Sequence, residues 1–354
     1  MNKFNSIIAM AIVAATFTAC KKDSSEPVIV VPPSDGSTLT LNGLIGAEAG
    51  SSAGNSVYVD FSKDKQTSVA RASWDLGFYS GDEFRVILNH TAGATAIALD
   101  KTDLNQVTAA DTTALATSAA LALGQGAGGF GLVDAVSGTK SAYLSGTVIK
   151  EVSATDAANK VYIINRGAAG FTENRGWQKV RVLRSGNGYT LQYAKINETT
   201  FKTLVVAKDA NYNFKAVSFV NGPVNVEPAK ADWDIEWSLS TYKASETIPY
   251  TFSDFVILNF IAGVQAGEVL TSKVSYADFK ESDISSVTFK SERDVIAGNW
   301  RITSGGTLGV KTDRFYAVKD GAGNVYKLKF VSFISNDGGT RGKPVMEYKL
   351  VKKA

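Results

Sequence analysis

The sequence has 354 residues and a formal net charge of +3, with 44% hydrophobic and 20% charged residues. This composition is typical of a folded globular protein and argues against intrinsic disorder. The length allows two domains of ordinary size, and the small net charge gives no reason to expect nucleic-acid binding. One histidine and one cysteine in the whole chain exclude zinc sites built from several such residues and exclude an intrachain disulfide.

Residues 1–20 are predicted to be a signal peptide that is removed from the mature protein. Lys3 gives the segment a positive start, residues 7–16 form an apolar stretch too short to span a bilayer, and small residues precede Cys20. This order resembles a bacterial lipobox, which implies that Cys20 is lipidated and becomes the new N-terminus. An ordinary secretory signal with an incidental cysteine is the alternative.

Residues 21–37 are predicted to be a tether between the lipid anchor and the folded part. Three of the seven prolines lie in this segment, which favours a semi-rigid spacer. The charged residues directly after Cys20 resemble the export signals of surface lipoproteins in the Bacteroidetes. We therefore expect an outer-membrane lipoprotein that faces the cell exterior, with a periplasmic face as the alternative.

A strand-like phrase occurs twice in the chain. Residues 74–78 read Trp-Asp-Leu-Gly-Phe and residues 233–237 read Trp-Asp-Ile-Glu-Trp. Each phrase is followed by Val-Ile-Leu-Asn, at residues 86–89 and 256–259, which indicates an internal duplication. We expect the tryptophan of each phrase in the core and its aspartate on backbone groups. An aromatic platform for sugar stacking is the alternative.

Alternating residues typical of β-strands run through both halves. We predict an all-β fold of two related antiparallel domains in tandem, at residues 38–200 and 201–354. Few short helices are expected, in the alanine- and leucine-rich stretch at 101–124. Strands are predicted at residues 38–42, 56–61, 84–88, 161–164, 177–183, 189–196, 202–206, 214–220, 256–260, 314–319, 325–330 and 344–351.

Few residues could carry chemistry. His90 follows a predicted strand in a turn without an obvious partner, so taken alone it is expected at the surface, although its imidazole suits haem iron chemically. Met346 lies in the last predicted strand, where a core role is expected. A Gly-x-Ser-x-Gly match at residues 50–54 lacks the preceding strand and following helix of a nucleophile elbow. We predict no catalytic residue.

Several stretches together resemble the HmuY family of Bacteroidetes lipoproteins, whose characterised members are haem-binding, haemophore-like proteins of all-β fold. These stretches are the Trp-Asp-Leu-Gly-Phe phrase, the Val-Thr-Ala-Ala-Asp-Thr run at 107–112 and the Arg-Phe-Tyr-Ala-Val-Lys strand at 314–319. The resemblance covers most of residues 38–354. It implies a non-enzymatic protein that captures haem at the cell surface and passes it to a TonB-dependent outer-membrane receptor.

Known members of the family coordinate iron through two histidine or methionine side chains. By elimination, His90 and Met346 are the candidate haem ligands of this chain. Haem held by one ligand with apolar packing, or a different ligand altogether, are the alternatives. The competing function is a surface carbohydrate- or protein-binding β module without haem. A hydrolase using paired carboxylates such as Asp232 and Asp234 is disfavoured, because these are more simply strand residues on one face.

Overall fold

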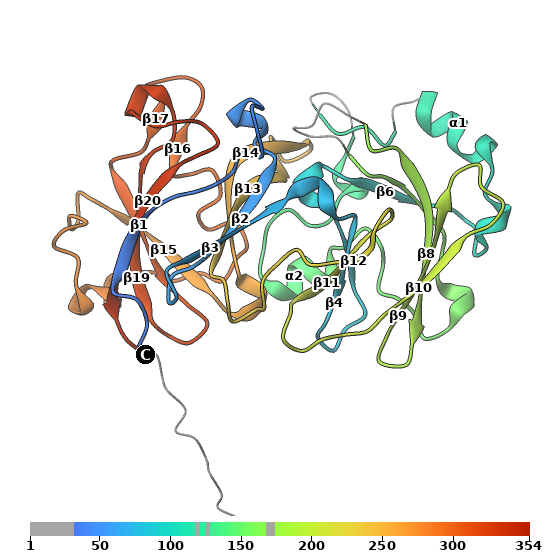
Figure 1. Ribbon diagram of the computed structural model, residues 1–354, viewed down its shortest axis with the longest axis horizontal. Helices are drawn as coiled ribbons and strands as arrows, with labels where there is room; N and C mark the ends of the chain where they lie inside the picture. The colour runs from blue at the N-terminus through green and yellow to red at the C-terminus, as the bar shows by residue number, and fades with distance from the viewer. Residues whose placement is uncertain (1–31, 118–119, 125–127, 168–173) are drawn as a thin grey trace, which may run out of the picture. The chain divides into compact units, whose positions relative to one another are not determined.

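The computed structural model describes residues 32–117, 120–124, 128–167 and 174–354. The predicted signal peptide at 1–20, its Cys20, and the tether up to residue 31 lie outside the described residues. Pro33–Ala354 form one compact unit, and its sheets are antiparallel throughout (Figure 1). The predicted all-β fold is confirmed.

Two five-stranded sheets lie at opposite ends of this unit (Figure 1). One sheet consists of β6 (Thr95–Ala98), β7 (Tyr162–Asn165), β8 (Trp177–Ser185), β9 (Gly188–Lys195) and β10 (Lys202–Val206). The other consists of β15 (Gln265–Leu270), β18 (Arg314–Lys319), β19 (Val325–Ser332), β20 (Val345–Lys352) and β1 (Gly36–Thr40). In the first of these sheets, strands that follow one another in the chain are neighbours, as in an antiparallel meander; in the second, the same holds from β15 to β20, while β1 pairs with the last strand, β20.

Two four-stranded sheets lie between them, and each combines strands from both halves of the sequence. One contains β5 (Val86–Leu88), β4 (Leu76–Tyr79), β11 (Phe214–Ser218) and β12 (Gly222–Val224). The other contains β14 (Pro249–Leu258), β13 (Ile235–Lys243), β2 (Asn55–Asp60) and β3 (Lys65–Ala70). A small ribbon pairs β16 (Arg301–Ile302) with β17 (Gly309–Val310). The predicted boundary at residues 200 and 201 falls between β9 and β10, which pair within one sheet.

The first copy of the repeated phrase is held by a fixed set of hydrogen bonds. The side-chain amide of Asn89 donates to the carbonyl of Trp74 at 2.8 Å. The backbone N–H of Asp75 donates to the carbonyl of Val217 in β11 at 2.8 Å. The carboxylate of Asp75 accepts from the backbone N–H of Phe219 at 2.7 Å.

The second copy repeats these bonds one for one. The side-chain amide of Asn259 donates to the carbonyl of Trp233 at 2.8 Å. The N–H of Asp234 donates to the carbonyl of Val59 in β2 at 2.7 Å, and its carboxylate accepts from the N–H of Phe61 at 2.8 Å. The prediction that these aspartates satisfy backbone groups is confirmed.

The two copies therefore exchange strands. The first phrase pairs with β11, which comes from beyond residue 200, and the second phrase pairs with β2, from before it. Likewise the N-terminal β1 completes the sheet of β20, while β10 completes the sheet of β9. Each half of the sequence supplies strands that the sheets of the other half need.

The chain builds its cores from alternating apolar residues, as predicted for a strand fold. One core cluster lies around β2, β13, β14, β19 and β20, and a second around β4, β5 and β6 to β9. Strand β13 is buried from Ile235 to Thr241, which indicates cover on both faces of its sheet. The two tryptophans of the repeated phrases are buried, with exposed fractions of 5% and 6% for Trp74 and Trp233.

Short helices account for little of the described chain. The helix α1 (Ala109–Thr117) lies in the predicted alanine-rich stretch, where the Asp111 carboxylate accepts from the N–H of Thr108. A second helix, α2 (Lys140–Ser145), was not predicted and buries Tyr143 and Leu144. None of the helices described reaches the length and apolar character that crossing a bilayer would need.

Candidate functional site

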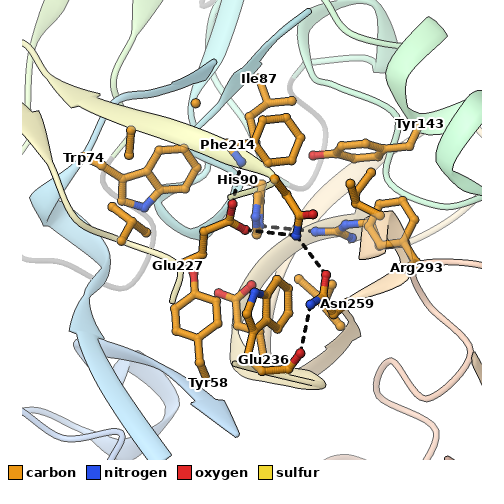
Figure 2. A pocket seen from close by; sticks show the side chains of 18 residues that line it. Tyr58, Trp74, Ile87, His90, Tyr143, Phe214, Glu227, Glu236, Asn259 and Arg293 are labelled. Carbon is orange, nitrogen blue, oxygen red and sulfur yellow. Dashed lines mark hydrogen bonds between the residues drawn. The ribbon is translucent and has the colours of Figure 1, made fainter. Parts of the chain in front are cut away.

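Two adjoining cavities lie where the two repeated phrases meet. The inner pocket lies between Trp74, Trp233, Glu227, Glu236, Tyr143 and Arg293, and has about 60 Å³ of free space (Figure 2). The outer groove lies between Tyr79, Lys140, Tyr212, Lys230, Trp233 and Phe260, and has about 880 Å³. The two cavities share the walls formed by Asn213, Trp233, Phe260 and Ile261. The groove is of the size usual for ligand sites, whereas the inner pocket suits only a small ligand.

Equivalent positions of the two phrases line the inner pocket together. The strand pairing of each phrase with its own Val-Ile-Leu-Asn segment places Gly77 opposite Ile87 and Glu236 opposite Ile257, so opposite residues point to one side of their sheet. The pairs are Trp74 and Trp233, Gly77 and Glu236, Ile87 and Ile257, and His90 and Phe260. The copies therefore differ where they face the pocket, because one copy presents a glycine and a histidine where the other presents a glutamate and a phenylalanine.

Aromatic rings form most of the pocket wall. The rings of Tyr58 and Trp233 pack edge to face with centroids 5.1 Å apart. On the opposite side Tyr143, from α2, packs edge to face on Phe260 at 5.2 Å. These arrangements are favourable for aromatic pairs and hold the rings in fixed orientations. The pocket is therefore a preformed, mostly apolar space.

Two carboxyl groups interrupt this apolar wall. Glu227 follows β12 and accepts a hydrogen bond from the backbone N–H of Phe214, which fixes its position (Figure 2). Burial, followed by smaller effects that include the nearby Glu236, raises the pKa of Glu227 to about 8. Burial also raises the pKa of Glu236, against the opposing effects of Ser56 and Arg293. At neutral pH the pocket therefore favours the protonated form of Glu227.

Two polar atoms at the pocket have no hydrogen-bond partner within the described chain. They are Oε1 of Glu236 and Nε1 of Trp233, and both residues are more than nine-tenths buried. Buried polar groups are normally paired, because leaving one unpaired costs about 1–3 kcal/mol. The carboxyl oxygen of Glu236 and the indole N–H of Trp233 are thus available to a ligand.

His90 and Arg293 form the polar end of the pocket. A guanidinium nitrogen of Arg293 donates to Ser240 Oγ at 2.8 Å and contacts Nδ1 of His90 at 3.2 Å. Because a guanidinium can only donate, Nδ1 of His90 must accept, and the ring proton then lies on Nε2. Burial, and then the charge of Arg293, lower the pKa of His90 well below its usual value, so the imidazole is neutral.

A family model described as HmuY protein matches this chain over residues 52–348. The chain belongs to the HmuY family. No curated protein and no solved structure gives a significant match. The HmuY match runs once through both halves of the sequence, so the expected two tandem copies of the HmuY unit are not confirmed.

The structure does not bring the two candidate haem ligands of this HmuY chain together. Met346 is fully buried in β20, opposite Leu39 of β1 and Phe330 of β19, and lines neither cavity. The core role expected for Met346 from the sequence is confirmed. His90 lines the inner pocket, partly buried rather than exposed, and its Nε2 carries the proton that an iron ligand would have to lose.

Sequence reasoning missed the charged residues of the inner pocket. Glu236 had a usable signal, because it stands within the repeated phrase at the position of Gly77 and so projects from a buried strand. Glu227 and Arg293 had none, since they lie in irregular segments whose pocket positions follow only from the tertiary fold.

Proposed function

We propose that the protein captures haem in the outer groove. The observation that carries this proposal is a groove of about 880 Å³ with aromatic walls, at the junction of the repeats of a HmuY-family chain. The flat, apolar porphyrin would pack on Trp233, Phe260 and Ile261, while its propionates would reach the exposed ammonium groups of Lys140 and Lys230.

The groove would hold the iron without His90 or Met346. Among the described residues that line it, histidine, methionine and cysteine are absent. Tyr79 and Tyr212 do line it, and tyrosine is an established type of haem-iron ligand. The proposal therefore places tyrosine oxygen, rather than imidazole or thioether, next to the iron.

The cellular role follows from the sequence. A chain lipidated at Cys20 would be held at the outer membrane, facing the cell exterior, with residues 21–37 as its tether. Capture there would be followed by transfer of haem to a TonB-dependent receptor. The protein would act without catalysis, as a binder and carrier.

A haemin titration followed by absorbance tests the proposal. We expect a Soret shift in the wild-type protein that is retained in His90→Gln, whose amide oxygen can still accept from Arg293. We expect an altered Soret band in Tyr212→Phe, and affinities lower by up to about five-fold in Lys140→Ala or Lys230→Ala, because exposed ion pairs contribute about 0.2–1 kcal/mol. Lys65→Ala, in β3, is the matched control.

Two results would contradict this assignment. If the wild-type protein gives no Soret shift, haem is not the ligand. If His90→Gln alone abolishes the shift, the iron lies in the inner pocket instead of the groove.

A second function is favoured by two observations. His90 is fixed in the tautomer that cannot bind iron through Nε2, and the other candidate ligand is closed in the core. These features suit a surface carbohydrate- or protein-binding module. Retention on a glycan array without any Soret shift would support that function.

We infer that the fold arose by duplication of one unit followed by exchange of strands. The support is the one-for-one match of the hydrogen bonds around Asp75 and Asp234 and the reciprocal pairing of β2 and β11.

A further inference from the structure

The inner pocket combines aromatic faces with acidic groups. Trp74, Tyr58 and Trp233 are each at least 94% buried and line this pocket together with Glu227 and Glu236. Figure 2 shows Trp74 and Tyr58 on the side of the pocket where Glu227 lies. Rings of this kind attract a cation at their faces, and the attraction is strongest when the cation is desolvated. Aromatic walls with an acidic group therefore suit a positively charged organic ligand.

A bound cation would stabilise the ionised forms of the two carboxyl groups. Glu236 contributes to the raised pKa of Glu227, because the two carboxyls repel each other when both are ionised. A positive charge between them would offset this repulsion and the cost of burial together. Oε1 of Glu236, which has no partner in the described chain, is the atom ready to receive it.

The two neighbouring arginines do not fill this role. Arg293 donates to the carbonyl of Val136 and to Ser240, and Arg71 donates to backbone carbonyls of Ala53 and Thr91. A further donor of Arg293 contacts Nδ1 of His90 at 3.2 Å. They moderate the charge of the pocket without occupying its centre.

The size of the pocket limits the ligand. Its free space of about 60 Å³ corresponds to about five water molecules, which is far too little for a porphyrin. The unpartnered indole N–H of Trp233 would in addition donate to a hydroxyl or ether oxygen of the ligand.

We propose that the inner pocket binds a small organic ammonium ion with a nearby oxygen, of the size of choline or ethanolamine. The ammonium lies against Trp74, Tyr58 and Trp233 and faces Glu227 and Glu236, while the oxygen accepts from Trp233 Nε1. This site is separate from the groove proposed for haem and does not depend on haem binding.

Calorimetric titration of the full folded chain with choline tests the proposal. The control ligand is 3,3-dimethylbutan-1-ol, which has the shape of choline without its charge. We expect choline to bind and the alcohol to bind at least ten-fold more weakly. The proposal is overturned if choline and the alcohol bind equally well. It is also overturned if neither choline nor ethanolamine binds.

Variants then locate the site. Glu227→Gln keeps an acceptor for the N–H of Phe214 and should weaken choline binding at least ten-fold, with the haemin response unchanged. Glu246→Gln, in an exposed turn, removes the same charge elsewhere and should have no effect. Unchanged choline affinity in a folded Glu227→Gln protein, checked by near-ultraviolet circular dichroism, contradicts the site.

Discussion

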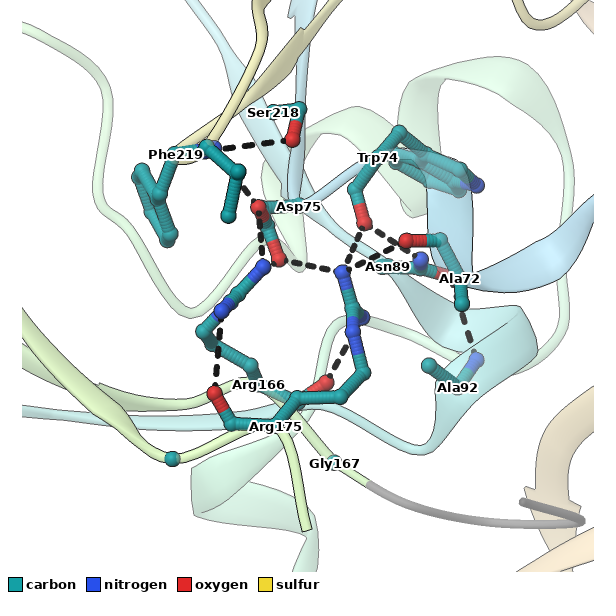
Figure 3. A network of polar contacts seen from close by, with 12 residues as sticks. Ala72, Trp74, Asp75, Asn89, Ala92, Arg166, Gly167, Arg175, Ser218 and Phe219 are labelled. Carbon is teal, nitrogen blue, oxygen red and sulfur yellow. Dashed lines mark hydrogen bonds and ion pairs between the residues drawn. The ribbon is translucent and has the colours of Figure 1, made fainter. Parts of the chain in front are cut away.

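Asp75 and Asp234 occupy the same position of the repeated phrase and make the same backbone hydrogen bonds. They differ in that, among the residues that the structure describes, only the carboxylate of Asp75 is paired with positive charges. Figure 3 shows Asp75 between two arginines, with Arg166 Nε at 2.8 Å and a guanidinium nitrogen of Arg175 at 2.6 Å. Asp234 has no such partner in the described chain. Burial first, and then the charges of Asp60 and Asp320, raise its pKa to about 8.

Asp75→Asn should destabilise the protein. The substitution leaves two largely buried guanidinium groups without their shared carboxylate, and removing one partner of a buried ion pair costs about 3–5 kcal/mol. Urea unfolding followed by tryptophan fluorescence measures the change. A loss smaller than about 1 kcal/mol would show that the arginines find other partners.

Asp234→Asn should have the opposite effect at neutral pH. The folded pKa of about 8 lies above the unfolded value of 3.8, so the folded state keeps a proton that the unfolded state releases between these values. The contribution of Asp234 is therefore fully present below pH 4 and is lost as pH rises to 8, by up to about 1.4 kcal/mol per pH unit.

The asparagine cannot ionise, so the variant should gain stability over the wild type progressively between pH 4 and pH 8. Urea unfolding at a series of pH values measures this difference. A constant difference across that range would contradict the raised pKa.

For single residues, the sequence predicts roles within the repeated phrase better than contacts between distant parts of the chain. The core position of Trp74 and the backbone bonds of Asp75 are as expected from the repeated phrase, although both residues precede β4 and both are buried. The environment of His90 does not, because Arg293, whose donor fixes its tautomer, lies 203 residues away in sequence.

The edge strand β1 protects one edge of the five-stranded sheet that also contains β15, β18, β19 and β20. It pairs with β20 from Gly36↔Lys349 to Thr40↔Val345 and covers the outer edge of that strand. An uncovered strand edge offers unpaired N–H and C=O groups to other chains.

Removal of residues 1–40 should therefore lower stability and promote self-association, compared with removal of residues 1–33 only, which leaves β1 whole. Light scattering coupled to size exclusion, with urea unfolding, measures both effects. If the two truncated proteins behave alike, β1 contributes nothing to either.

Strands with clear alternation are predictable from the sequence, whereas β3, β6 and β15 were not predicted, and the pairing partners of the strands are not encoded locally. The predicted strands at 214–220 and 325–330 overlap β11 and β19, because each contains alternating apolar residues with turn signals nearby. The pairing of β11 with β4 joins segments more than 130 residues apart, and no local pattern encodes it. Helix α2 was missed because its six residues are too short for a helical period.

For the molecule as a whole, strand exchange ties the two halves into one folding unit. Neither half of the sequence contains all the strands of its own sheets. We therefore expect a single cooperative thermal transition by calorimetry, with equal calorimetric and van't Hoff enthalpies.

Fragments 38–200 and 201–354 should each remain unfolded alone, because each lacks a pairing partner for its repeated phrase. Circular dichroism of the separate fragments and of their mixture tests this expectation. A fragment that shows native strand signal and a sharp melt by itself would refute it.

The position of β1 also has a mechanical consequence. The segment that precedes the fold enters it through this strand, so a pull from the N-terminal side reaches the ladder of β1 and β20 before any core. Drawn along the strand axis, the five residue pairs of that ladder share the load in shear, whereas a sideways pull peels them apart singly. A force applied on the N-terminal side is thus borne first by the pairing of β1, the first strand of the fold, with β20, the last.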